Sequence, residues 1–133
     1  MSRSFIVEIL FLVPIIGFAA FGCGRDREAD RLAECQSNQR QILDVLLIYA
    51  DRHRGKLPSD LTLLVKYGYL MPETLVCPEA RGKNVGPYVL FPVTDLNGPD
   101  AAVTPVICCR AHPGKTVVGY ADGHVSVIAG SLP

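Results

Sequence analysis

One long apolar segment near the start of the chain limits what this sequence can fold into. The residues from Phe5 to Cys23 (FIVEILFLVPIIGFAAFGC) carry a single charged side chain, that of Glu8. As a helix with a rise of about 1.5 Å per residue, the segment would be about 28 Å long, close to the hydrocarbon thickness of a bilayer. A chain of 133 residues is too small to bury such a helix on all sides. Residues 1–24 are therefore predicted to form a leader and a membrane helix.

The charges on either side of this segment predict its orientation. Arg3 precedes the segment, and residues 25–56 contain seven basic and six acidic side chains. A basic residue directly before a membrane helix and a charge-dense segment of mixed sign after it fit an orientation in which Arg3 stays in the cytoplasm. We therefore expect a single-pass protein with a cytoplasmic N-terminus and an exported domain, residues 25–133.

The first part of the exported domain has the apolar spacing of an amphipathic helix. Its apolar positions recur every three or four residues: Leu32, Cys35, Ile42, Leu46 and Tyr49. This spacing predicts a helix over residues 27–53 that buries one face, with polar Gln39 interrupting the apolar stripe. Gly55 and Pro58 are typical stop signals after such a helix.

The rest of the domain is predicted to contain one short helix and several strands. Ser59 or Asp60 can cap a helix over 59–67 that ends before Gly68, and the proline-rich and glycine-rich residues from 69 to 87 are predicted to be a loop. Within the β-rich region 85–129, short strands are expected at 88–91, 106–109, 116–121 and 124–128. Asp122-Gly123 predicts a two-residue type I′ hairpin turn. The expected fold is α+β, a long helix packed on a small antiparallel sheet.

Composition and known catalytic patterns argue against two classes of function. The 13 basic residues balance the 13 acidic residues, which removes the general electrostatic attraction to nucleic acid. The sequence has no glycine-rich phosphate loop, no Gly-x-Ser-x-Gly elbow and no His-Glu-x-x-His pattern. We therefore expect neither a nucleic-acid-binding protein nor an enzyme, and no cofactor.

The apolar segment resembles a known type of N-terminus. Glu8 followed by Ile15-Ile16-Gly17 is similar to the start of type IV pilins and type II secretion pseudopilins. The resemblance implies that Glu8 acts in assembly, by pairing with the N-terminal amine of a neighbouring subunit. The implied cleavage site lies between Arg3 and Ser4, where no glycine precedes it, so an uncleaved anchor is an alternative.

The exported domain resembles a group of bacterial pseudopilin-like proteins that have a C-terminal His-x9-Asp-Gly pattern. The matching positions are Cys35, Asn38, Gln41-Ile42, Tyr49, Gly55-Lys56-Leu57-Pro58, Cys77-Pro78 and, at the C-terminal end, His112 with Asp122-Gly123. The resemblance implies a pilin-like fold in the bacterial inner membrane with a periplasmic or other extracytoplasmic domain. It also implies pseudopilin-like subunits or secretion and pilus machinery as partners, and self-association.

An alternative interpretation of the N-terminal segment uses its last residues. Ala20-Phe21-Gly22-Cys23 resembles a bacterial lipobox, in which a lipidated Cys23 becomes the mature N-terminus. The protein would then be an exported lipoprotein that acts as a binding module. Both interpretations export the same domain.

The remaining cysteines allow either a disulfide or a metal site. In an exported domain, Cys35 on the helix and Cys77 in the loop are the preferred disulfide pair. Cys108 and Cys109 are adjacent in a strand and should face opposite sides. A zinc site would recruit Cys77, Cys108 or Cys109, His112 and His124. Because adjacent cysteines lack the two-residue gap of a zinc knuckle, we expect no metal.

The His-x9-Asp-Gly residues are expected to have a structural role. Asp122 and Gly123 would form the hairpin turn, and His112 would bring its imidazole to the loop backbone beside the sheet. The alternative is a ligand or cation site formed by His112, Asp122 and His124.

Overall fold

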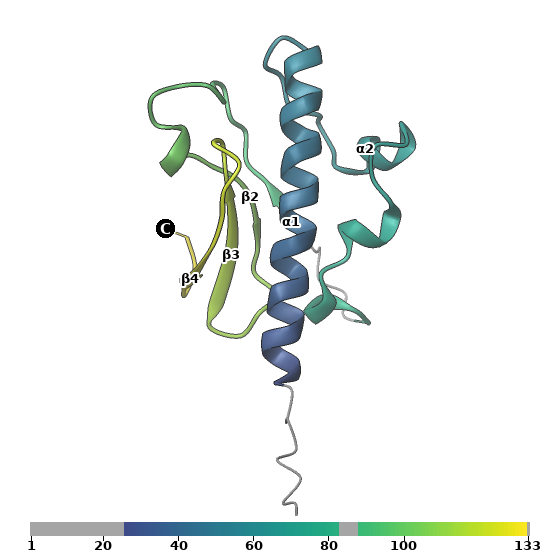
Figure 1. Cartoon of the computed structure of the whole chain (residues 1–133), viewed down its shortest axis with the longest axis vertical. Helices are drawn as coiled ribbons and strands as arrows, with labels where there is room; N and C mark the ends of the chain where they lie inside the picture. Colours follow the sequence, from purple (N-terminus) through teal and green to yellow (C-terminus); the bar gives the residue numbers. More distant parts are fainter. Residues whose placement is uncertain (1–25, 83–87, 133) are drawn as a thin grey trace, which may run out of the picture.

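The computed structural model describes residues 26–82 and 88–132 (Figure 1). A single long helix, α1, runs through the middle of this part of the protein. An antiparallel sheet lies against one side of α1, and a segment with short helices lies against the other (Figure 1). The architecture is α+β, as expected from the sequence.

Helix α1 spans Arg27–Arg52 and ends one residue before the expected boundary. Asp26 caps its start, because its Oδ1 accepts a hydrogen bond from the backbone N–H of Glu28 at 3.1 Å. The face that packs in the interior consists of Cys35, Gln39, Ile42, Leu43, Leu46 and Ala50. Gln39, the polar residue within the apolar stripe, is itself buried on this face.

The second helix is shorter than expected. Helix α2 spans Thr62–Lys66, inside the expected range 59–67. Asp60 Oδ1 accepts from the N–H of Thr62 at 2.6 Å, so Asp60, and not Ser59, stabilises its start. Gly68 ends the helix with φ of +74°, as glycine after a helix commonly does.

The segment expected to be a loop contains two turns of 3₁₀ helix. These are η1, Pro72–Leu75, and η2, Pro78–Ala80. Each begins with a proline, whose fixed φ and missing N–H suit the first position of a helix. Both turns contact α1, so this segment is a packed layer of the domain.

The described strands form an antiparallel meander in the order β1-β2-β3-β4. The strands are β1 Val89–Leu90, β2 Pro105–Cys109, β3 Lys115–Tyr120 and β4 Val125–Ala129, and the 3₁₀ turn η3, Ala101–Val103, precedes β2. The expected strands appear within one or two residues of their expected ends. The sheet is small because its first strand has only two residues.

The turn between β3 and β4 differs from the expected two-residue type I′ turn. Gly119 pairs with Val125, and the N–H of Tyr120 donates to the carbonyl of His124 at 2.9 Å. The loop therefore has three residues, and among its non-glycine residues none has a positive φ in the described structure. Only Gly123, with φ of +92°, does. This is the type I turn followed by a left-handed glycine that three-residue hairpins favour.

The core lies between α1 and the sheet. Ile42, Leu43 and Leu46 of α1 are fully buried with Val106 and Ile107 of β2. On β3, an added Cβ at Gly119 would meet Ile107 Cγ2 of the neighbouring strand β2 at 2.8 Å and Leu43 Cδ2 of α1 at 3.3 Å. The absence of a side chain at Gly119 therefore sets how closely the helix approaches the sheet.

The substitution Gly119→Ala is expected to destabilise the protein by about 1–3 kcal/mol, because the added methyl group overpacks this contact. Urea denaturation of the full-length protein in detergent would measure the free energy of unfolding. Gly98→Ala is the matched control. Its Cβ would meet only the exposed carboxylate of Asp95, which can turn away, so we expect a loss below about 1 kcal/mol. Equal losses in the two variants would contradict the proposed packing.

The predicted membrane helix, residues 5–23, lies outside the described residues. Within residues 26–82 and 88–132, no helix combines the length and the apolar character needed to cross a bilayer.

Candidate metal centre

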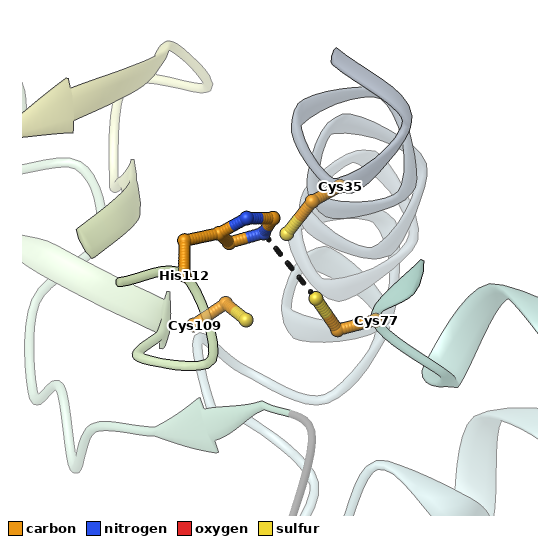
Figure 2. Close-up of side chains that lie close together, drawn as sticks. All are labelled: Cys35, Cys77, Cys109 and His112. Atoms are coloured by element: carbon orange, nitrogen blue, oxygen red, sulfur yellow. Dashed lines mark hydrogen bonds between the residues drawn. The ribbon is translucent and has the colours of Figure 1, made fainter. Parts of the chain in front are cut away.

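Four side chains from three separate parts of the fold converge at one point in the interior. They are Cys35 of α1, Cys77 directly before η2, Cys109 at the end of β2, and His112 in the turn between β2 and β3 (Figure 2). The sulfur atoms and an imidazole nitrogen all lie within 4.8 Å of one another. Within the group, His112 Nε2 lies 3.4 Å from Cys77 Sγ.

The group is closed to solvent. Cys35, Cys77 and Cys109 have no exposed surface, and His112 is 3% exposed. Ala80 and Val117 pack in the same cluster as the three cysteines. Polar side chains gathered in such a dry environment are costly unless they interact strongly with one another or with a ligand.

Local structure explains why each side chain points inward. Cys35 lies one helical turn before Gln39 on the buried face of α1. Cys77 has an extended backbone, with φ of −65° and ψ of 131°, and directly precedes Pro78. Cys109 ends β2 on the strand face opposite to that of Cys108, because successive side chains in a strand alternate.

Two backbone N–H groups are directed at the sulfur atoms. That of Glu79 donates to Cys77 Sγ, and that of Ala111 donates to Cys109 Sγ. In both cases the donor lies two residues after the cysteine. The hydroxyl of Tyr88 adds a weaker contact, donating to Cys35 Sγ at 3.9 Å. Such donors stabilise a sulfur that carries negative charge.

Hydrogen bonds among the thiols separate their pKa values. The hydrogen bond with Cys109, and to a lesser extent the one with Cys35, lowers the pKa of Cys77 well below the usual range of a thiol. The pKa of Cys35 is raised by its hydrogen bonds to Cys109 and Cys77 and by burial. For Cys109, the hydrogen bond with Cys35 lowers the pKa, but that with Cys77 and burial outweigh it, raising the pKa to about 11. The contacts with the neighbouring thiols therefore favour a thiolate at Cys77.

Ion pairs attach the surrounding segments to the first turns of α1. Arg31 pairs with Glu79, Arg81 pairs with Glu34, and Lys115 Nζ lies 3.0 Å from Glu28 Oε1. These pairs are partly exposed, so each contributes at most about 1 kcal/mol. They hold η2 and the start of β3 near the part of α1 that carries Cys35.

The structure brings some of the predicted site residues together and separates others. Cys35 and Cys77 lie close together, as the disulfide prediction requires, but no disulfide bond connects them in this structure. Cys109 and His112 lie in the same group. The imidazole of His112 faces thiols, not the loop backbone as expected. The disulfide itself stays a prediction.

The alternative ligand site of His112, Asp122 and His124 does not form. His112 precedes β3 and Asp122 follows it, so the strand separates them. Asp122 instead serves the turn: its Oδ1 accepts from the N–H of His124 at 3.1 Å and lies 2.5 Å from His124 Nδ1. The hydrogen bond from the His124 backbone lowers the pKa of Asp122. Two other predicted residues, Glu8 and Cys23, lie outside the described residues.

The adjacent residues Cys108 and Cys109 lack the two-residue gap of a zinc knuckle, but Cys109-Arg110-Ala111-His112 has that gap. Paired zinc ligands are typically separated by a few residues in this way. The contribution of Cys35 had no such signal, because its partners are distant in sequence.

Comparisons with known proteins do not identify a relative: no family model, curated protein or solved structure matches the chain.

Proposed function

We propose that this chain is a membrane-anchored, pseudopilin-like envelope protein with a structural or interaction role in a type II secretion or pilus-like assembly. Residues 1–24 would anchor it in the inner membrane, and residues 25–133 would lie in the periplasm or otherwise outside the cytoplasm. Its partners would be the membrane, further subunits of the same kind, including copies of itself, and the assembly machinery.

The observation that carries this proposal is the order of elements along the chain. The apolar segment ends at Cys23, and α1 begins at Arg27. This helix carries a small antiparallel sheet on one side. A domain whose first helix begins just after a membrane segment, and which carries a compact sheet on that helix, is an arrangement suited to lateral packing of subunits.

The chemistry of the described residues also favours a structural role over catalysis. Their cluster of reactive side chains is the group formed by Cys35, Cys77, Cys109 and His112, and it is buried. An active site needs access for a substrate and, at a metal, an open coordination position. A closed group of this kind favours a structural role for these four residues.

Glu8→Gln is expected to abolish crosslinked oligomers in membranes while leaving membrane insertion intact. The carboxylate would no longer pair with the positively charged amine of a neighbouring subunit inside the bilayer, where a charged partner matters most. Chemical crosslinking followed by electrophoresis measures the oligomers, and carbonate extraction measures insertion.

The matched control is Glu73→Gln, the same change at an exposed position of η1 in the exported domain. This control should crosslink like the wild type. Unchanged crosslinking in Glu8→Gln would remove the assembly role. Mass spectrometry of the mature N-terminus separates the anchors: a start at Ser4 supports the pseudopilin proposal, and a lipidated Cys23 supports the lipoprotein alternative.

A further inference from the structure

We propose that Cys35, Cys77, Cys109 and His112 together bind one zinc ion, as three thiolates and one neutral imidazole, and that this ion is structural. The inference is independent of the proposed assembly function, because it depends only on residues of the exported domain. It also revises the expectation, drawn from spacing along the chain, that no metal is bound.

The spacing of the four atoms matches a tetrahedral site. With Zn–S bonds of about 2.3 Å and a Zn–N bond of about 2.05 Å, the ligand atoms lie about 3.8 Å (S···S) and 3.6 Å (S···N) apart. In the structure every pair lies within 4.8 Å, and His112 Nε2 lies 3.4 Å from Cys77 Sγ. Small side-chain rotations would bring all four atoms onto one ion.

The chemistry of the four ligands selects the metal. Three sulfurs and one imidazole at tetrahedral spacing are typical of zinc, whereas calcium and magnesium require oxygen ligands. An iron–sulfur cluster would need room for inorganic sulfide as well as iron. Four ligand atoms within 4.8 Å of one another enclose space for a single ion.

A disulfide would leave the group incomplete. Joining Cys35 to Cys77 would use two sulfurs and leave Cys109 and His112 buried beside an uncharged bridge. His112 Nδ1 already has no hydrogen-bond partner among the described residues. Burying an imidazole with one unsatisfied nitrogen is costly, and a bond from Nε2 to a metal would be a compensating interaction.

The surroundings suit bound thiolates. Three thiolates and a divalent ion carry one net negative charge, and the backbone N–H groups of Glu79 and Ala111 donate to two of the sulfurs. Hydrogen bonds to ligand atoms of this kind orient the ligands and tune a metal site. The protons released on binding leave with solvent as the site forms.

Four protein ligands with no open position define a structural site. The ion would connect the central helix α1 to the two layers that flank it: the segment before η2 on one side, and the turn between β2 and β3 of the sheet on the other (Figure 1). It would lie near the N-terminal half of α1, where Cys35 is located, and would fasten that end of the domain.

The test measures metal in the full-length protein purified in detergent without chelators. We expect one zinc per chain by plasma mass spectrometry, with iron and copper negligible. X-ray absorption at the zinc edge should show about three sulfurs near 2.3 Å and one nitrogen near 2.05 Å. These measurements use the wild type and do not depend on any variant folding.

Substitutions then assign the ligands. Cys109→Ser and His112→Ala should lower the apparent zinc affinity by more than about 100-fold, since loss of a ligand exceeds the 10–100-fold effect of losing its supporting contacts. Cys108→Ser is the control, because Cys108 is the adjacent residue, equally buried, and outside the group. It should keep one zinc.

Four results would overturn the proposal. Two concern the metal in the wild type: the absence of stoichiometric zinc, or stoichiometric iron or copper in its place. The others are a wild-type protein carrying a Cys35–Cys77 disulfide and an equal loss of zinc in Cys108→Ser and Cys109→Ser.

Discussion

Chelation of the proposed zinc should lower the thermal unfolding temperature of the full-length protein in detergent by more than about 12 °C. Structural zinc sites have apparent binding free energies on the order of 10 kcal/mol. For a domain of this size, each kcal/mol lost shifts Tm by roughly 4–8 °C. Losing even a third of the binding free energy therefore produces the expected shift. Circular dichroism melts with and without excess EDTA would measure it.

Two controls isolate the effect of the metal. EDTA loaded with zinc beforehand should leave Tm unchanged, and Cys108→Ser should respond to free EDTA as the wild type does. Cys109→Ser should already melt at a low temperature and should be insensitive to EDTA. If the wild type melts at the same temperature with and without free EDTA, the group does not hold a structural metal.

Ile42→Ala is expected to reduce the free energy of unfolding by about 2–5 kcal/mol, because it removes buried methyl groups and leaves a cavity between α1 and the sheet. Ile42 has no exposed surface. Urea denaturation of the full-length protein in detergent, followed by pulse proteolysis, would measure the loss.

The same helix provides a matched control. Ile48 is 50% exposed, and Ile48→Ala makes the same chemical change with the same effect on helix propensity. We expect its free energy of unfolding to stay within about 0.5 kcal/mol of the wild type. Similar losses at the two positions would mean that the packing of α1 against the sheet does not determine stability.

Local patterns predicted the secondary structure well. The three-and-four spacing from Leu32 to Tyr49 places α1, because burial of one helical face depends on residues that are close in sequence. Gly68 ends α2 with a positive φ, a conformation that other residues adopt at a cost. Stop signals and short β-rich runs placed α2 and the strands to within a few residues, whereas η1 and η2 lie in a segment expected to be a loop.

One local prediction failed where packing overrode the pattern. Asp122-Gly123 was expected to form a two-residue turn, but the pairing of Gly119 with Val125 fixes a three-residue loop. Gln39, the polar residue within the apolar stripe, is buried, and its Nε2 donates to the carbonyl of Val117 at 3.0 Å. A polar side chain can occupy the core when a neighbouring strand supplies an acceptor, and the sequence does not show that strand.

Sequence patterns predict the apolar N-terminal segment, the long amphipathic helix, the β-rich second half and the α+β class, because each depends on residues a few positions apart. That Cys35, Cys77, Cys109 and His112 meet follows only from the three-dimensional packing. Those residues lie on a helix, a loop and a strand end, and their distances depend on how α1 packs between two layers. No periodicity along the chain records that packing, since it is set by contacts such as that of Gly119 with Leu43.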